Sequence, residues 1–285
     1  MGGGVWTSAS YNTATRSMGF LDSASLSNAS VQEVYREHYL NPILNPHGVI
    51  RECCDSEEHP ETVPVILALD VTGSMGHAAT TCAGKLDEIM TELYGQIKDV
   101  EFMMMGIGDL AYDDAPIQAS QFESDIRILD QTTKIYFEGG GGGNSFESYT
   151  AAWYFGLHNT RLDCWKRGKK GVIITLGDEP LNPYLPGAAL GEVLGCNAQD
   201  VDTEELYKEV TEKFDVYHIA ITDESSYRHY ATKIKESWGK LLGQRLFIAT
   251  SNELPKIIGE IIRDHENIIS AEVGTVEVTG EGISW

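Results

Sequence analysis

The amino-acid sequence predicts an α/β protein with a doubly wound, mostly parallel central sheet and helices on both faces. Two observations support this prediction. Apolar runs such as VPVILALD, which begins at Val63, show no alternation with polar residues. Such runs are typical of strands that are buried on both faces. From Val63 onward these runs alternate with segments of helical periodicity. Alternating strands and helices favour a parallel sheet that is covered on both sides.

Six apolar segments are predicted strands, and the third of them is a candidate edge strand. They cover residues 63–70, 100–109, 115–122, 169–178, 215–222 and 245–250. Apolar residues spaced three or four apart predict the intervening helices. These helices cover residues 75–98, 124–131, 148–160, 203–214, 225–238 and 252–266. Ser124 and Ser251 are candidate N-caps, because a serine hydroxyl can accept a hydrogen bond from a free backbone N–H in the first turn.

The remaining segments differ in composition from this core. Gly, Ser, Ala, Thr and Asn dominate the first segment, which we predict to be a flexible arm or a segment ordered only by a partner. The predicted organisation is a flexible arm at residues 1–30, a helical and polar lead-in at 31–62, the α/β domain at 63–267 with an irregular insertion at 179–200, and a β-like C-terminal tail at 268–285.

Composition and charge restrict the classes of partner. The chain has 285 residues, 43 of them acidic and 21 basic, which gives a net charge of −22. A field of that sign repels phosphate groups, so we expect neither nucleic-acid nor membrane binding. No segment approaches the roughly 18 apolar residues of a membrane span. The N-terminus has no apolar signal region, and the five cysteines form no CxxC pair. We therefore expect a cytoplasmic protein with reduced thiols.

Oxygen-bearing side chains follow the first strand at alternate positions. Asp70 ends the apolar run, Thr72 and Ser74 follow it, and Gly73 permits a tight turn between them. A carboxylate that leaves a buried strand is costly unless it is paired. Two neighbouring hydroxyls indicate a hard cation as its partner, because such ions prefer oxygen ligands. The alternative is that Asp70 caps the following helix.

Further oxygen ligands follow other strands. Asp178 follows a second central strand, and the glycine-rich loop GGGGGNSFES carries Asn144, Ser145 and Glu147. Asp109 also lies at a strand end. It is either a hydrogen-bond acceptor beside the metal ligands or a residue of its own turn. In parallel sheets, ligands bind beyond the carboxyl ends of the strands at a topological switch point. We therefore predict a site for Mg²⁺, or for Mn²⁺ or Ca²⁺, whose ligands are Asp70, Thr72, Ser74, Asn144, Ser145 and Asp178.

With these motifs, residues 64–265 resemble the von Willebrand factor type A domain, a Rossmann-like fold. In that family an Asp-x-Ser-x-Ser loop, a third-loop Thr and a later Asp form the metal-ion-dependent adhesion site. Asp70, Thr72 and Ser74 match the first loop, and Asp178 matches the later aspartate. The third-loop Thr has no clear match. The loop is closest to the variant of the alpha-kinase-associated branch, where Asn144 takes the Asp place and Glu147 the Glu place.

The resemblance implies a non-enzymatic adaptor whose metal shell is completed by an Asp or Glu side chain of a partner protein. One alternative is a structural subunit of a multiprotein or phage-like assembly, with self-association through the arm or the tail. Another alternative is a metal-dependent hydrolase with Asp109 or Glu147 as its base. The glycine run lacks the Gly-Lys-Ser/Thr sequence of a P-loop, so a nucleotide triphosphatase is not expected. Glu147 could also cap its own helix.

Overall fold

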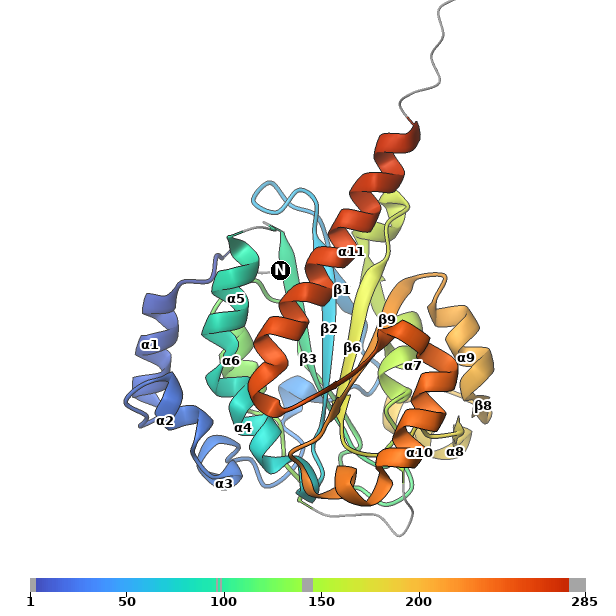
Figure 1. Ribbon diagram of the computed structural model, residues 1–285, viewed down its shortest axis with the longest axis horizontal. Helices are drawn as coiled ribbons and strands as arrows, with labels where there is room; N and C mark the ends of the chain where they lie inside the picture. The colour runs from blue at the N-terminus through green and yellow to red at the C-terminus, as the bar shows by residue number, and fades with distance from the viewer. Residues whose placement is uncertain (1–3, 96, 98, 140–145, 277–285) are drawn as a thin grey trace, which may run out of the picture.

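A six-stranded sheet forms the centre of the protein (Figure 1). The computed structural model describes residues 4–95, 97, 99–139 and 146–276, with side chains placed as far as residue 266. The strand order is β10-β9-β6-β2-β3-β4, and the pairing is parallel except between β3 and β4. The strands are β2 Val63–Asp70, β3 Val100–Ile107, β4 Ile117–Ala119, β6 Gly171–Gly177, β9 Phe214–Ile221 and β10 Leu246–Ala249. The predicted fold class is confirmed, including the edge position of the third strand.

Helices cover both faces of this sheet, so that it separates two hydrophobic clusters. Successive side chains of a strand point to opposite faces. Leu67 and Leu69 of β2 join the cluster under α4, α5, α6 and α11, whereas Ile66 and Ala68 join the cluster under α7, α8, α9 and α10. These helices are α4 Gly76–Gly84, α5 Leu86–Tyr94, α6 Arg127–Thr132, α7 Ala151–His158, α8 Gly187–Leu194, α9 Thr203–Val210, α10 Ser225–Leu242 and α11 Leu254–Val276.

Two predicted helical features differ from the structure. The helix expected over residues 75–98 is two helices, α4 and α5, which meet at Lys85. A Cβ at Gly84 would overlap Ser27, so this position needs a glycine, and glycine weakens a helix. Ser124 does not cap α6, which begins at Arg127. Its hydroxyl instead donates to the backbone oxygen of Gly4, at 2.6 Å.

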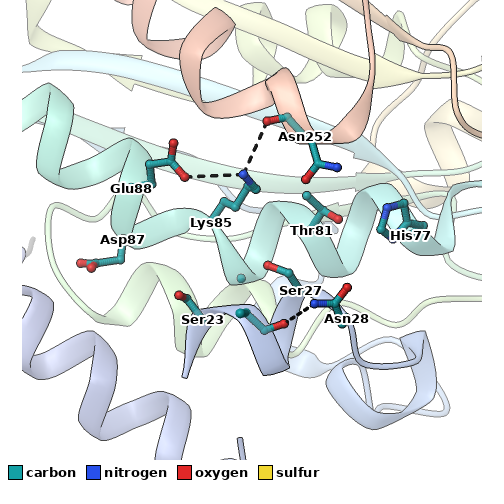
Figure 2. Close-up of a pocket in the computed structure, with 11 residues that line it drawn as sticks. Ser23, Ser27, Asn28, His77, Thr81, Lys85, Asp87, Glu88 and Asn252 are labelled. Atoms are coloured by element: carbon teal, nitrogen blue, oxygen red, sulfur yellow. Dashed lines mark hydrogen bonds and ion pairs between the residues drawn. The ribbon is translucent and has the colours of Figure 1, made fainter. Parts of the chain in front are cut away.

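The N-terminal segment is folded against the domain, so the prediction of a flexible arm is wrong for the described residues. It forms α1 Ser8–Ser17 and α2 Ser23–Ser27. Tyr11 is fully buried, and its hydroxyl donates to the backbone oxygen of Gly84, at 2.7 Å. A polar cavity of about 380 Å³ lies between α2 and the helices α4 and α5. Figure 2 shows the residues that line it. Lys85 in this cavity lies 3.6 Å from Glu88, so its charge is already partnered.

The lead-in is partly helical, as predicted. It contains α3 Val31–Val34, the 3-10 helix η1 Pro42–Leu44 and the strand β1 Arg51–Cys53. β1 pairs in parallel with β5 Thr160–Leu162, outside the central sheet. Within the described part of the chain, no helix combines the length and the apolar character needed to cross a membrane.

The insertion and the tail differ from their predictions. The insertion contains α8, flanked by the antiparallel pair β7 Tyr184–Leu185 and β8 Val201–Asp202. Gly187 and Gly191, which obscured this helix in the sequence, leave room for the backbone of residues 196–200. Helix α11 continues to Val276, so a β-like conformation is wrong for residues 268–276, and the rest of the tail lies outside the described residues.

A buried histidine next to the sheet centre predicts sensitivity to acid. His218 on β9 is fully buried, stacks on Trp238 with ring centroids 3.8 Å apart, and lies 2.8 Å from the Thr175 hydroxyl. Burial lowers the pKa of His218 to about 3. In the unfolded chain this histidine binds a proton below about pH 6.5, whereas in the folded protein it stays neutral down to about pH 3. Folding stability is therefore lost as the pH falls below about 6.5.

We expect the stability advantage of the wild type over His218→Phe to shrink by about 2 kcal/mol between pH 7.5 and pH 5.0. Urea unfolding of both proteins in EDTA measures this difference. An unchanged difference would show that the histidine is protonated in the folded state.

Candidate metal centre

The candidate centre lies at the carboxyl ends of β2 and β6, where the strand order reverses. Strands β3 and β4 follow β2 on one side, whereas β6, β9 and β10 extend the sheet on the other. Asp70 is the last residue of β2, and Asp178 directly follows β6. The two strands are neighbours up to the pair Leu69 and Leu176. The fold therefore places both carboxylates at the switch point, as the sequence predicted.

Asp70 is fully buried and held by three hydrogen bonds. Its Oδ1 accepts from the backbone N–H of Thr72, at 2.9 Å, and from the Thr72 hydroxyl, at 2.6 Å. Its Oδ2 accepts from the hydroxyl of Tyr149, at 2.6 Å. Burial raises the pKa of Asp70, and the charge of Asp178 raises it further, against these hydrogen bonds. The carboxylate is thus positioned by polar groups without being neutralised.

Asp178 is equally buried and connects three loops. Its Oδ1 accepts from the hydroxyl of Ser74, at 2.9 Å, so that the first loop contacts the last. Its Oδ2 accepts from the backbone N–H of Ser226 at the start of α10, at 2.9 Å. Burial raises the pKa of Asp178, and these hydrogen bonds oppose the rise. Ser74 and Asp178 are therefore in direct contact, although 104 residues separate them.

Two buried glutamates each have a carboxyl oxygen without a partner in the described part of the chain. Glu147 is 3% exposed, and its Oε2 has no hydrogen-bond partner among the described residues. Oε2 of Glu179 is also buried and unpartnered in that part of the chain. Burial raises the pKa of Glu147, and the charges of Asp70 and Glu179 raise it further. Burial followed by the charge of Asp178 raises the pKa of Glu179 to about 7.

The described residues supply no cation for this group of acids. No Lys, Arg or His nitrogen in the described ranges lies within 4.0 Å of the carboxylates of Asp70, Glu147 or Asp178. Several buried carboxylates without a counter-charge cost folding free energy, and they protonate unless a cation compensates them. The arrangement therefore favours a bound cation.

Asp109 serves its own turn. Its Oδ1 accepts from the backbone N–H of Ala111, at 2.8 Å, and its backbone oxygen accepts from Tyr112 and Asp113. Its backbone N–H donates to the carboxylate of Asp113, at 2.7 Å. These hydrogen bonds agree with the turn interpretation of Asp109. Its carboxylate still adds to the negative field that raises the pKa of Glu147.

The structure brings four of the six predicted ligands together and does not address the other two. Asp70 with Thr72 and Asp178 with Ser74 form two hydrogen-bonded pairs, and the charge of Asp178 acts on Asp70. Asn144 and Ser145 lie outside the described residues, so their role remains a prediction. Glu147 precedes α7, which begins at Ala151, and its carboxylate belongs to the acid group of the site.

Two further residues near the candidate site were not predicted from the sequence. Tyr149, assigned there to a helix, orients Asp70 through its hydroxyl. Nothing in the sequence marks this role. Glu224, which is 6% exposed, follows β9 and accepts from the backbone N–H of Ala78 in α4, at 2.5 Å. Burial and, to a lesser extent, the charge of Asp178 raise the pKa of Glu224 to about 7. Its position after a strand of the parallel sheet was the signal that could have identified it.

The residues present fit a hard divalent cation that keeps water ligands. In the portion of the chain that is described, no three His, Cys, Asp or Glu side chains form a ready metal cluster. An ion at this position would therefore need hydroxyl and water oxygens in addition to carboxylates. Mg²⁺ suits such a set, because it commonly takes one or two carboxylates and retains several waters. Thr72 and Ser74 supply hydroxyls next to the two buried aspartates.

Comparison with known proteins gives likenesses in structure but not in sequence. The chain matches no protein-family model, and no curated protein matches it. The pilus adhesin SpaC from Lactobacillus rhamnosus GG matches 77% of this chain at 13% identity and a TM-score of 0.48. This chain spans only 31% of the length of that adhesin.

Two further solved structures match over almost their full length. The vWF domain of the type V pili tip protein Mfa5 from Porphyromonas gingivalis is 11% identical, with 78% of this chain and 98% of that chain covered and a TM-score of 0.46. An aerotolerance-related membrane protein from Bacteroides fragilis is 14% identical, with coverages of 71% and 99% and a TM-score of 0.43. Likenesses at these identities say nothing about the residues of the candidate site.

Proposed function

We propose that the chain is a non-enzymatic protein-interaction module that depends on a divalent cation. The observation that carries this proposal is the group of buried carboxylates at the switch point, where the described residues provide no counter-charge. Asp70, Thr72, Ser74 and Asp178 would hold Mg²⁺, or Mn²⁺ or Ca²⁺, and the predicted third-loop oxygens of Asn144 and Ser145 would add to them. The resemblance to the von Willebrand factor type A domain agrees with this assignment.

The partner would present an Asp or Glu side chain that completes the metal shell. The net charge of −22 repels an acidic partner at long range, so a bound cation is needed as a local counter-charge. The cation would supply the positive charge, while the protein holds it through carboxylates that are already positioned. The hydrogen bonds from Tyr149 to Asp70 and from Ser226 to Asp178 fix both aspartates before any ligand arrives.

The alternatives receive less support from the geometry. For a hydrolase, Asp109 is committed to its own turn, which leaves Glu147 as the candidate base. For an assembly subunit that associates through its arm, the arm would have to leave the surface on which Tyr11 is buried, and the end of the tail lies outside the described residues. A metal-dependent interaction module requires no such rearrangement.

Affinity capture tests this proposal. The wild type and Asp178→Asn are immobilised and exposed to lysate of the source cells in Mg²⁺ or in EDTA, with the exposed Asp264→Asn as control. We expect a protein captured by the wild type and by Asp264→Asn in Mg²⁺, and lost in EDTA and with Asp178→Asn. A peptide with one glutamate should compete with that protein, whereas its glutamine analogue should not. Identical capture under all conditions would refute the proposed function.

A further inference from the structure

A second cavity lies next to the loop that carries Asp109 and Asp113, whose charges act on Glu147 of the candidate metal centre. It has a volume of about 410 Å³ and is bounded by the lead-in, by the loop that follows β3, and by α8. Leu110, immediately after Asp109, lines it, and the backbone N–H of Leu110 donates to the Ser148 hydroxyl, at 3.0 Å. Asp113 also lines it and accepts from the backbone N–H of Asp109. One loop therefore borders both the cavity and the candidate metal centre.

The wall of this cavity combines apolar and acidic groups. Its apolar lining includes Leu110, which is 6% exposed, Ile117, which is fully buried, and the part-buried Val193. Its acidic lining consists of Asp113, Asp114 and Glu192. The carboxylate of Glu138 lies close by, because it accepts from the backbone N–H groups of Asp114 and Ala115, at 2.8 and 3.3 Å.

These acids have no basic partner in the described portion of the chain. None of Asp113, Asp114, Glu138 and Glu192 forms an ion pair with a described Lys, Arg or His. The described lining contains no Lys or Arg, and His47 is the one histidine in it. The cavity thus has the charge that attracts a cation and an apolar surface that a small hydrated ion would leave uncovered.

We propose that this cavity receives a Lys or Arg side chain of the same partner whose carboxylate is proposed to reach the metal centre. The proposal rests on the proposed function and defines the partner more closely, as a segment with one basic and one acidic residue near each other. Such a side chain lays its aliphatic stem on apolar surface and keeps its charged head among carboxylates. Arginine suits the site best, because its planar donors match carboxylate geometry.

Titration with defined peptides tests this inference. The first probe is a capped Gly-Arg-Gly peptide, compared with the same peptide carrying neutral citrulline, both followed by NMR of the protein in EDTA. We expect the arginine peptide to shift the amides of Leu110, Ala115 and Val193, and the citrulline peptide to leave them unchanged. The double variant Asp114→Asn, Glu192→Gln should bind the arginine peptide roughly fivefold more weakly. Glu236→Gln, an exposed acid on α10, is the matched control.

The second probe separates this inference from the proposed function. Peptides that carry one Arg and one Glu, with one to four glycines between them, are titrated in Mg²⁺ and in EDTA beside a peptide with Glu alone. At the favourable spacing the two-charge peptide should bind at least tenfold more tightly in Mg²⁺ than either single-charge peptide. Equal binding of arginine and citrulline would overturn the inference, even if the Glu peptide still required Mg²⁺. A Glu peptide indifferent to Mg²⁺ would instead refute the proposed function.

Discussion

Replacing Asp70 with Asn should abolish Mg²⁺ binding and leave the metal-free protein at least as stable as the wild type. Asp70 is fully buried, and burial together with the charge of Asp178 raises its pKa, so the ionised carboxylate is unfavourable without a cation. Asn keeps an oxygen for the N–H of Thr72 and removes the charge. The substitution also removes one of the two buried carboxylates that would bind the cation.

Calorimetry and urea unfolding, with and without Mg²⁺, measure both effects. At a Mg²⁺ concentration of about 100 times the dissociation constant, the wild type should gain about 2.7 kcal/mol of stability, and Asp70→Asn should gain none. Asp130→Asn, an exposed acid on α6, should behave as the wild type does. Undiminished Mg²⁺ affinity in Asp70→Asn would show that the site is wrongly assigned.

Replacing Gly177 with Ala should destabilise the protein by about 3 kcal/mol, at the upper end of the usual cost of overpacking. A Cβ at this last residue of β6 would overlap the ring and hydroxyl of Tyr149. That ring is fully buried and packs edge-on against His218 and Trp238, so it cannot move freely. Its displacement would also disturb the hydrogen bond to Asp70.

Urea unfolding of Gly177→Ala, of Tyr149→Ala and of the double variant measures this contact. Removing the ring should relieve the overlap, so the double variant should lose less stability than the sum of the two single variants. Gly239→Ala is the matched control, because its Cβ would meet Leu246 at an ordinary 3.8 Å and a helix favours Ala over Gly. Additive losses, or a stable Gly177→Ala, would contradict a close contact between Gly177 and the Tyr149 ring.

The sequence by itself predicted where the candidate site lies. Asp70 and Asp178 each follow an apolar run, and the carboxyl ends of neighbouring parallel strands meet at one edge of a sheet. Their proximity could therefore be predicted without coordinates, although 108 positions separate them. Thr72 and Ser74 could be predicted as well, because they follow Asp70 in the same loop. Strand periodicity and loop position are local properties that the sequence shows directly.

The tertiary structure decided which other side chains reach the candidate site, that the N-terminal arm folds, and where the acidic cavity forms. Tyr149 contacts Asp70, and Glu147 adds a buried carboxyl group, because α7 packs beside β2. The arm folds because Tyr11 and Leu26 find a core on α4 and α5, although its composition indicates disorder. The acidic cavity arises because α8 packs beside the loop after β3. Such contacts join residues far apart in the chain, so they depend on packing between elements, which no local pattern of residues records.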